Sequence, residues 1–139
     1  MFKSSVVLSL LVFAAGNPAL AKARVATPDQ VVAHHLRAFT QHNWDALIQD
    51  YAPNAVVITQ NGPIEGIPAI YKFYQSINSI TPAPDFQVTL VPAVGDAGLA
   101  DWVMNPHKPG SLKGHDIFIV RNGKIQFQTT VNVRPASQP

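Results

Sequence analysis

Hydrophobic and polar positions follow a helical spacing near the start of the chain. Residues 28–42 place their apolar side chains on one arc at 100° per residue, which predicts an amphipathic helix. Thr27 is suited to cap this helix, and Pro28 is suited to its first turn. The apolar arc consists of Val31, Val32, Leu36 and Phe39. His35 lies inside that arc and not on the polar face.

Two more helices and a strand are predicted in the next part of the chain. Residues 44–51 favour a short second helix that ends at Pro53. Residues 55–60 are rich in β-branched side chains and predict a strand, closed by a turn at 61–63. The helical spacing then returns over residues 67–77.

From Phe86 onward the pattern is that of strands. The predicted strands are 86–94, 99–105, 113–120 and 124–133. The last two are joined by the tight-turn sequence at 121–123. Because the strands follow the helices, we expect an α+β fold: one curved, mostly antiparallel sheet wrapped around N-terminal helices.

The first residues have the pattern of a secretory signal peptide. Lys3 precedes an apolar run over 6–15, and Ala19 and Ala21 form a small-residue cleavage motif. The run is about half of the roughly 20 residues that a bilayer span requires. We therefore expect cleavage after Ala21 and a periplasmic or secreted protein that is not held in the membrane. The expected units are a signal peptide over 1–21, one domain over 22–134 and a tail over 135–139.

Composition narrows the classes of partner and chemistry. Without Lys3, nine basic residues oppose eight acidic ones, and they form no basic stripe that would indicate a nucleic-acid partner. Cysteine is absent, which excludes thiol catalysis and thiolate metal sites. The histidines have no metal-ligand spacing, so neither a metal nor another cofactor is expected.

Several short motifs together resemble a known family. They are Trp44-Asp45, the run from Tyr51 to Ala55, Glu65 between Gly62 and Gly66, and Asn122-Gly123-Lys124-Ile125. With them the chain resembles the SnoaL-like, nuclear-transport-factor-two-like superfamily, which includes ketosteroid isomerases. The resemblance implies a cystatin-like α+β barrel with a cone-shaped pocket, and a homodimer. It says little about activity, because this fold hosts isomerases, dehydratases, hydrolases, cyclases and plain binding modules.

The catalytic positions of ketosteroid isomerases are only partly matched. Those enzymes use a carboxylate base together with a tyrosine and a protonated aspartic acid that bind an oxyanion. The resemblance places the base at Thr59, which has no pKa near neutrality, the tyrosine at His35 and the aspartic acid at Asp116. It therefore argues against ketosteroid isomerisation as such.

Asp116 and His35 are the candidate catalytic residues. The register implied by the resemblance turns Asp116 into the pocket, where burial would raise its pKa and let it donate a hydrogen bond. Asp116 could equally be a solvated residue near a strand start. His35 is either an ordinary core residue or a proton shuttle oriented by Asp116. Some dehydratases and dehydrohalogenases of this fold use such a His–Asp pair.

The candidate ligand-binding residues are polar or aromatic. They are Thr59, Gln128, Thr130, Phe118, Tyr74 and Trp102. Gln128 and Thr130 either face the pocket or lie on a solvated or dimer-facing surface, and the aromatic residues are either pocket walls or core.

Two functions remain open at this point. One is an exported domain that binds a small, mostly apolar organic molecule, with or without acid/base turnover of the isomerase, dehydratase or hydrolase type. The other is a non-catalytic dimerisation or protein-interaction domain whose pocket is filled by its own side chains. A cavity of a few hundred Å³ would favour the first.

Overall fold

The structure is a computed structural model that describes residues 24–80 and 83–133. The predicted signal peptide over 1–21 and the predicted tail over 135–139 lie outside the described residues. Within the described ranges, no helix is both long enough and apolar enough to cross a membrane.

Three helices form one layer of the molecule. They are α1 (Pro28–Thr40), α2 (Trp44–Ile48) and α3 (Ile67–Ile77). Thr27 caps α1 as predicted, in a capping box with Gln30. The second helix is shorter than predicted, because Tyr51 already belongs to a strand. The carbonyl of Asp50 accepts the backbone N–H of Ile125 at 2.7 Å, so sheet pairing replaces the expected last turn of the helix.

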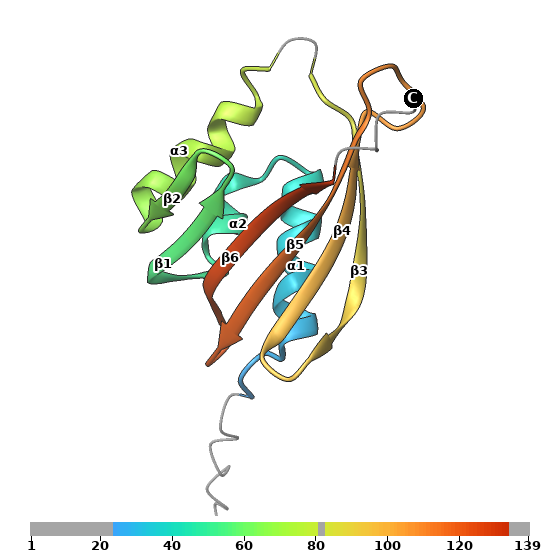
Figure 1. The fold of residues 1–139 in the computed structure, drawn as a ribbon. Coiled ribbons are helices and arrows are strands. Elements are labelled where there is room, and N and C mark those ends of the chain that lie inside the picture. Colours follow the sequence, from blue (N-terminus) through green and yellow to red (C-terminus); the bar gives the residue numbers. More distant parts are fainter. Residues whose placement is uncertain (1–23, 81–82, 134–139) are drawn as a thin grey trace, which may run out of the picture.

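Six strands form one mixed sheet. They are β1 (Tyr51–Thr59), β2 (Gly62–Glu65), β3 (Phe86–Val94), β4 (Ala97–Met104), β5 (Leu112–Arg121) and β6 (Lys124–Val133). The strand order is β2-β1-β6-β5-β4-β3 (Figure 1), with only the β1–β6 pair parallel. The α+β prediction is therefore confirmed. The sheet is curved but not closed, since β2 and β3 form its two edges, and β2 was not predicted.

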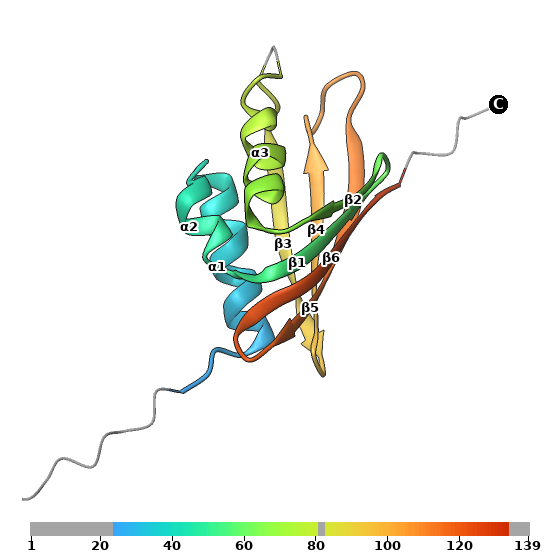
Figure 2. The ribbon, with the colours of Figure 1, turned by 90° about the vertical axis from the view of Figure 1, so that its left-hand side faces the viewer.

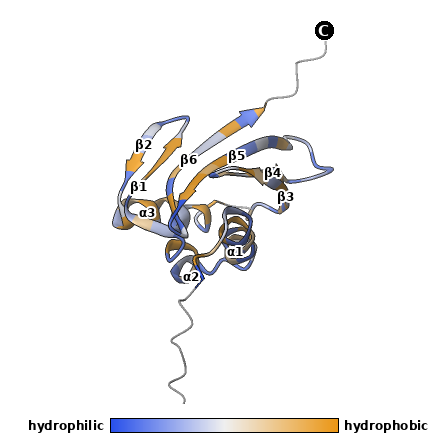
Figure 3. Ribbon diagram, turned by 90° about the horizontal axis from the view of Figure 1, so that it is seen from below, coloured by the Kyte–Doolittle hydropathy of each residue, from blue (hydrophilic) through white to orange (hydrophobic). Residues whose placement is uncertain are grey.

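The helices cover one face of the curved sheet (Figure 2). The buried residues of α1, which include Val31 and Val32, come from one side of a helix that carries both hydrophobic and hydrophilic residues (Figure 3). The close approach of α1 to β4 requires a glycine, because a Cβ atom on Gly98 would lie 2.5 Å from Cγ2 of Val32.

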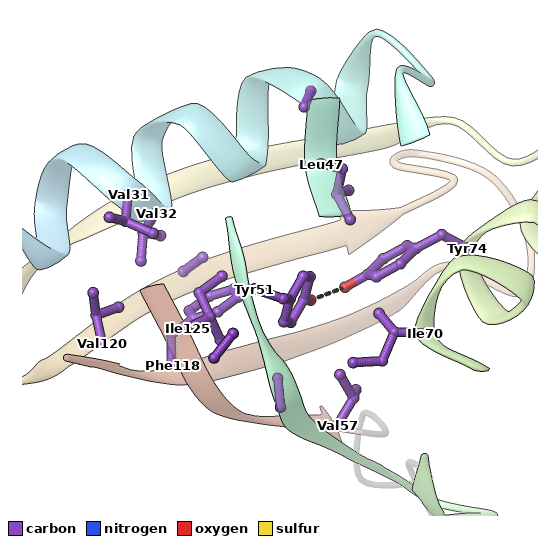
Figure 4. Close-up of a cluster of buried hydrophobic side chains, with 14 of the residues drawn as sticks. Val31, Val32, Leu47, Tyr51, Val57, Ile70, Tyr74, Phe118, Val120 and Ile125 are labelled. Carbon is purple, nitrogen blue, oxygen red and sulfur yellow. Dashed lines mark hydrogen bonds between the residues drawn. The ribbon is translucent and has the colours of Figure 1, made fainter. Parts of the chain in front are cut away.

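The core lies between the helices and the inner face of the sheet (Figure 4). Its largest fully buried side chains are Val32, Leu47, Val57, Ile70, Phe118, Ile125 and Gln128. Along β5, Phe118 and Val120 are buried while His115 and Ile117 are exposed, in the alternation that the strand pattern predicts. Gln128 is the polar member of this set, and it leads to the candidate site.

Candidate functional site

An open pocket of about 370 Å³ lies on the inner side of the sheet. The apolar part of its wall comes from α1, α3, β3 and β4, and includes Phe39, Phe73, Ile77, Phe86, Val88 and Trp102. The polar part includes residues of α1, α3, β5 and β6, and three residues at the turn between β1 and β2. These residues are His35, Tyr74, Asp116, Gln128, Thr130 and Asn132, and at the turn Thr59, Gln60 and Asn61. The pocket therefore combines a large apolar surface with a small group of polar side chains, as sites for small organic ligands do.

Asp116 is the acidic residue of the pocket lining. Its Oδ1 accepts the indole N–H of Trp102 and its Oδ2 accepts a side-chain N–H of Gln128, each at 3.0 Å. Burial raises the pKa of Asp116 to about 6, while Trp102, Thr130 and Gln128 hold it lower than burial alone would. A carboxyl group with such a pKa exchanges its proton easily near neutral pH.

A glycine lets the indole of Trp102 reach this carboxylate. Gly114 on β5 is the cross-strand partner of Trp102 on β4, and Asp116 lies two residues further along β5. A Cβ atom on Gly114 would lie 2.1 Å from Cζ2 of Trp102. The indole therefore lies across the glycine. A glycine two positions before a strand aspartate is a sequence signal that could have indicated this arrangement.

Gln128 connects Asp116 to two buried tyrosines. Its Oε1 accepts hydrogen bonds from the hydroxyl groups of Tyr51 and of Tyr74, the latter at 3.2 Å. The two hydroxyl oxygens lie 2.8 Å apart (Figure 4). Burial raises the pKa of both tyrosines, so both stay neutral and can act as donors. Sequence reasoning missed Tyr51, which it assigned to the second helix.

His35 lies at the other end of this network. Its Nε2 is 3.4 Å from the hydroxyl oxygen of Tyr74, and its ring meets that of Phe118 edge to face at 5.1 Å. Burial and the neighbouring His34 lower the pKa of His35 to about 3, so the ring is neutral at physiological pH. The expected direct His35–Asp116 pair is not formed, because Tyr74 and Gln128 connect the two residues.

The other predicted ligand-binding residues fall in different places. Those that line the pocket include Tyr74, Trp102, Gln128 and Thr130. Phe118 does not; it is fully buried in the core. Thr59 lines the pocket, but its hydroxyl donates to the carbonyl of Gly62 at 3.1 Å and accepts the N–H of Asn61 at 3.2 Å, so it is engaged in the β1–β2 turn. Within residues 24–80 and 83–133, no group of three His, Asp or Glu side chains could hold a metal ion.

Fold and sequence both identify the family. The curved sheet covered by helices is the cystatin-like, nuclear-transport-factor-two-like fold. The SnoaL-like domain family matches residues 32–127, and the chain belongs to that family. No curated protein matches the chain at a significant level.

Solved structures share this fold at low sequence identity. A protein of unknown function with a cystatin-like fold from Methylobium petroleophilum is 14% identical, with a TM-score of 0.66 over 83% of this chain and 81% of that one. A proposed ketosteroid isomerase from Kribbella flavida is 14% identical, with a TM-score of 0.63 over 81% and 82%. A proposed polyketide cyclase from Sinorhizobium meliloti is 21% identical, with a TM-score of 0.61 over 72% and 92%. At these identities the similarity shows a common fold and not a common activity.

Proposed function

We propose that the pocket binds a small, mostly apolar organic molecule and that Asp116 transfers protons to and from it. The observation that carries this proposal is a carboxyl group with a pKa of about 6 in the lining of an open, largely apolar pocket of about 370 Å³. Perturbed carboxyl groups in concave sites are characteristic of acid/base catalysis.

The hydrogen bonds around Asp116 suit this role. Trp102 and Gln128 each hold one carboxylate oxygen and so fix the plane of the group. When ionised, Asp116 can take a proton from one ligand atom, and when protonated it can return that proton to another. Isomerisation and dehydration both need such a group. His35 is neutral and contacts Tyr74, so its role in the proposal is to position the Tyr74 hydroxyl and not to act as the base.

The open pocket also bears on the competing hypothesis of a non-catalytic interaction domain. That hypothesis expects the cone to be filled by the protein's own side chains, whereas the pocket here has the volume of a ligand site. The structural neighbours include a proposed polyketide cyclase and a proposed ketosteroid isomerase, both named for reactions of small organic molecules. Thr59 occupies the position of the carboxylate base of ketosteroid isomerases, and threonine cannot act as that base. The reaction proposed here is therefore a different one.

Native mass spectrometry is the first test. The exported protein, purified without denaturation, is expected to carry a small molecule whose mass identifies its chemical class. Turnover of that molecule should be lost in Asp116→Asn and kept in Asp96→Asn, which removes the same charge at an exposed position outside the pocket. Equal turnover by the two variants would exclude Asp116 as the proton-transfer group.

We also propose that the chain is exported and that its signal peptide is removed after Ala21. The intact mass of the protein recovered from the periplasm or the medium should correspond to a chain that begins at Lys22. Recovery of the unprocessed chain from the cytoplasm would contradict export.

A further inference from the structure

The charge distribution of the pocket is one-sided. Asp116 is an acid, and the lining contains neither lysine nor arginine. The described residues form no ion pair with Asp116, and its hydrogen-bond donors Trp102, Gln128 and Thr130 are neutral. The ionised carboxylate therefore lacks a counter-charge within the pocket lining, and such a group is costly in an apolar surrounding.

Other titratable groups near Asp116 do not supply that charge. His35 is buried and neutral, and Tyr51 and Tyr74 are neutral. His115 is adjacent in sequence, and its charge contributes a small lowering of the pKa of Asp116 through the sheet. Its side chain nevertheless faces the outer side of the sheet, where its Nδ1 lies 2.6 Å from Oδ1 of Asp101, so it does not enter the pocket. A positive charge that meets the Asp116 carboxylate inside the pocket must therefore come from a ligand.

The geometry points to an amphipathic organic cation as the ligand: we propose that the pocket selects a molecule with a protonated amine on an apolar, aromatic or aliphatic body. The amine would pair with Asp116, and the body would lie among the aromatic side chains. This inference rests on the proposed function, because it names the class of small molecule that the same pocket takes.

Two features of the pocket support the amine. A carboxylate has about four acceptor positions, and the bonds from Trp102 and Gln128 together with the contact of Thr130 leave room for one more donor. Aromatic rings also attract cations, and three of them form a continuous wall: Phe39 and Phe86 have centroids 5.1 Å apart, and Phe86 and Trp102 6.3 Å. A carboxylate or phosphate ligand would meet only repulsion from Asp116.

Three probes that share one body separate the possibilities. They are 3-phenylpropylamine, 3-phenylpropanol and 3-phenylpropanoate, each titrated calorimetrically into the mature protein at pH 7.5. We expect the amine to bind about 10-fold or more tightly than the alcohol, and the carboxylate more weakly than the alcohol. The preference for the amine should disappear in Asp116→Asn, which should still bind the alcohol, and persist in Asp96→Asn.

The outcomes distinguish this inference from the proposed function. Equal binding of amine and alcohol would overturn the cation preference while leaving a pocket for small molecules. Absence of binding by all three probes, at concentrations up to their solubility, would overturn both. If Asp116→Asn fails to fold, a pH series on the unaltered protein gives the same answer: the advantage of the amine over the alcohol must shrink as the pH falls below about 6, where Asp116 takes up its proton. An advantage that is independent of pH would contradict the ion pair.

Discussion

Gln128 donates a side-chain N–H to the carboxylate of Asp116 at 3.0 Å. The direction of this bond is set from the other side, because the Gln128 carbonyl oxygen already accepts the hydroxyl groups of Tyr51 and Tyr74. The amide must therefore present its nitrogen to Asp116. A buried amide that is held by two tyrosines thus fixes both the position of the Asp116 carboxylate and part of its pKa.

Removal of this amide should raise the pKa of Asp116 above its value of about 6, because one of the bonds that stabilise the ionised form is lost. Gln128→Leu removes the amide and leaves an apolar side chain of similar size, so it is the variant of choice. We expect a loss of about 1–3 kcal/mol in the free energy of unfolding, since two tyrosine hydroxyls lose their acceptor. NMR titration of the Asp116 side-chain carboxyl carbon measures the pKa, and urea unfolding measures stability.

Gln126→Leu is the matched control, because the side-chain amide of Gln126 donates to the backbone carbonyls of Arg121 and Lys124, each at 3.4 Å, in the β5–β6 turn and away from Asp116. It should leave the Asp116 titration unchanged. Equal Asp116 pKa values in the Gln128 and Gln126 variants would show that the amide does not stabilise the carboxylate.

Gly114→Ala tests the placement of Trp102. The added methyl group would lie 2.1 Å from the indole and 2.5 Å from the backbone carbonyl oxygen of Val131, so both the indole and the adjacent backbone of β6 must shift. We expect Trp102 to lose its hydrogen bond to Asp116 and the pKa of Asp116 to rise. The tryptophan Nε1–H resonance and the carboxyl titration report the two effects. Gly110→Ala is the control for the titration of Asp116, because a Cβ atom at Gly110 would have no neighbour within 4 Å. The positive φ of 81° at Gly110 adds only local strain. An unshifted Trp102 resonance in Gly114→Ala would disprove the role of this glycine.

The dependence of stability on pH should separate Asp116 from His35. The pKa of Asp116 is raised from 3.8 to about 6 by folding, so its contribution to stability grows as the pH falls from about 6 to 4 and is lost as the pH rises. The pKa of His35 is lowered from 6.5 to about 3, so its contribution is complete above pH 6.5 and is lost as the pH falls toward 3. Between about pH 4 and 6 the two contributions oppose each other.

Single substitutions of Asp116 and His35 should therefore change the slope of the unfolding free energy against pH in opposite directions. As the pH falls from 6 to 4, Asp116→Asn should lose more stability than the unaltered protein does. In this variant the destabilising protonation of His35 is no longer offset by the stabilising protonation of Asp116. His35→Gln should lose less stability, or gain some, over the same interval. Urea unfolding at half-unit steps of pH measures both slopes. If the unfolding free energies of Asp116→Asn and His35→Gln depended on pH in the same way, the pKa shifts assigned to Asp116 and His35 would be wrong.

The sequence predicts local features of the site better than its long-range contacts. Period-two alternation is a property of each strand by itself, so the sequence alone assigns Asp116 to the same face of its strand as Phe118. The backbone hydrogen bond between Asp50 and Ile125 joins residues that are far apart in the sequence. Without knowledge of this bond, the sequence pattern assigns Tyr51 to the end of the second helix. The direct His35–Asp116 pair, which was one of the two alternatives for His35, also depends on contacts between distant parts of the chain. Tyr74 lies on α3, and its hydroxyl contacts Nε2 of His35 on α1. No local sequence pattern reveals that these two helices bring the side chains together.

The homodimer that the family resemblance implies remains a prediction, and the outer face of the sheet is the surface that we expect it to bury. Exposed apolar side chains gather there on β1, β5 and β6, namely Ile58, Ile117, Val131 and Val133. Asp101 and Lys113 are exposed on the same face, so a second copy related by a two-fold axis could match opposite charges as well as apolar groups. Sedimentation should show a dimer for the unaltered mature chain.

A charge at the centre of that face should dissociate the dimer. Ile117→Lys places an ammonium group among apolar neighbours, and burial of this charge in an interface would cost several kcal/mol, so the variant should sediment as a monomer. Val94→Lys is the control, because Val94 is 75% exposed at the end of β3 beside the β3–β4 turn. Both variants should keep the circular dichroism of the unaltered protein. A dimer that survives Ile117→Lys would place the interface on another surface, and a monomeric unaltered chain would refute the dimer itself.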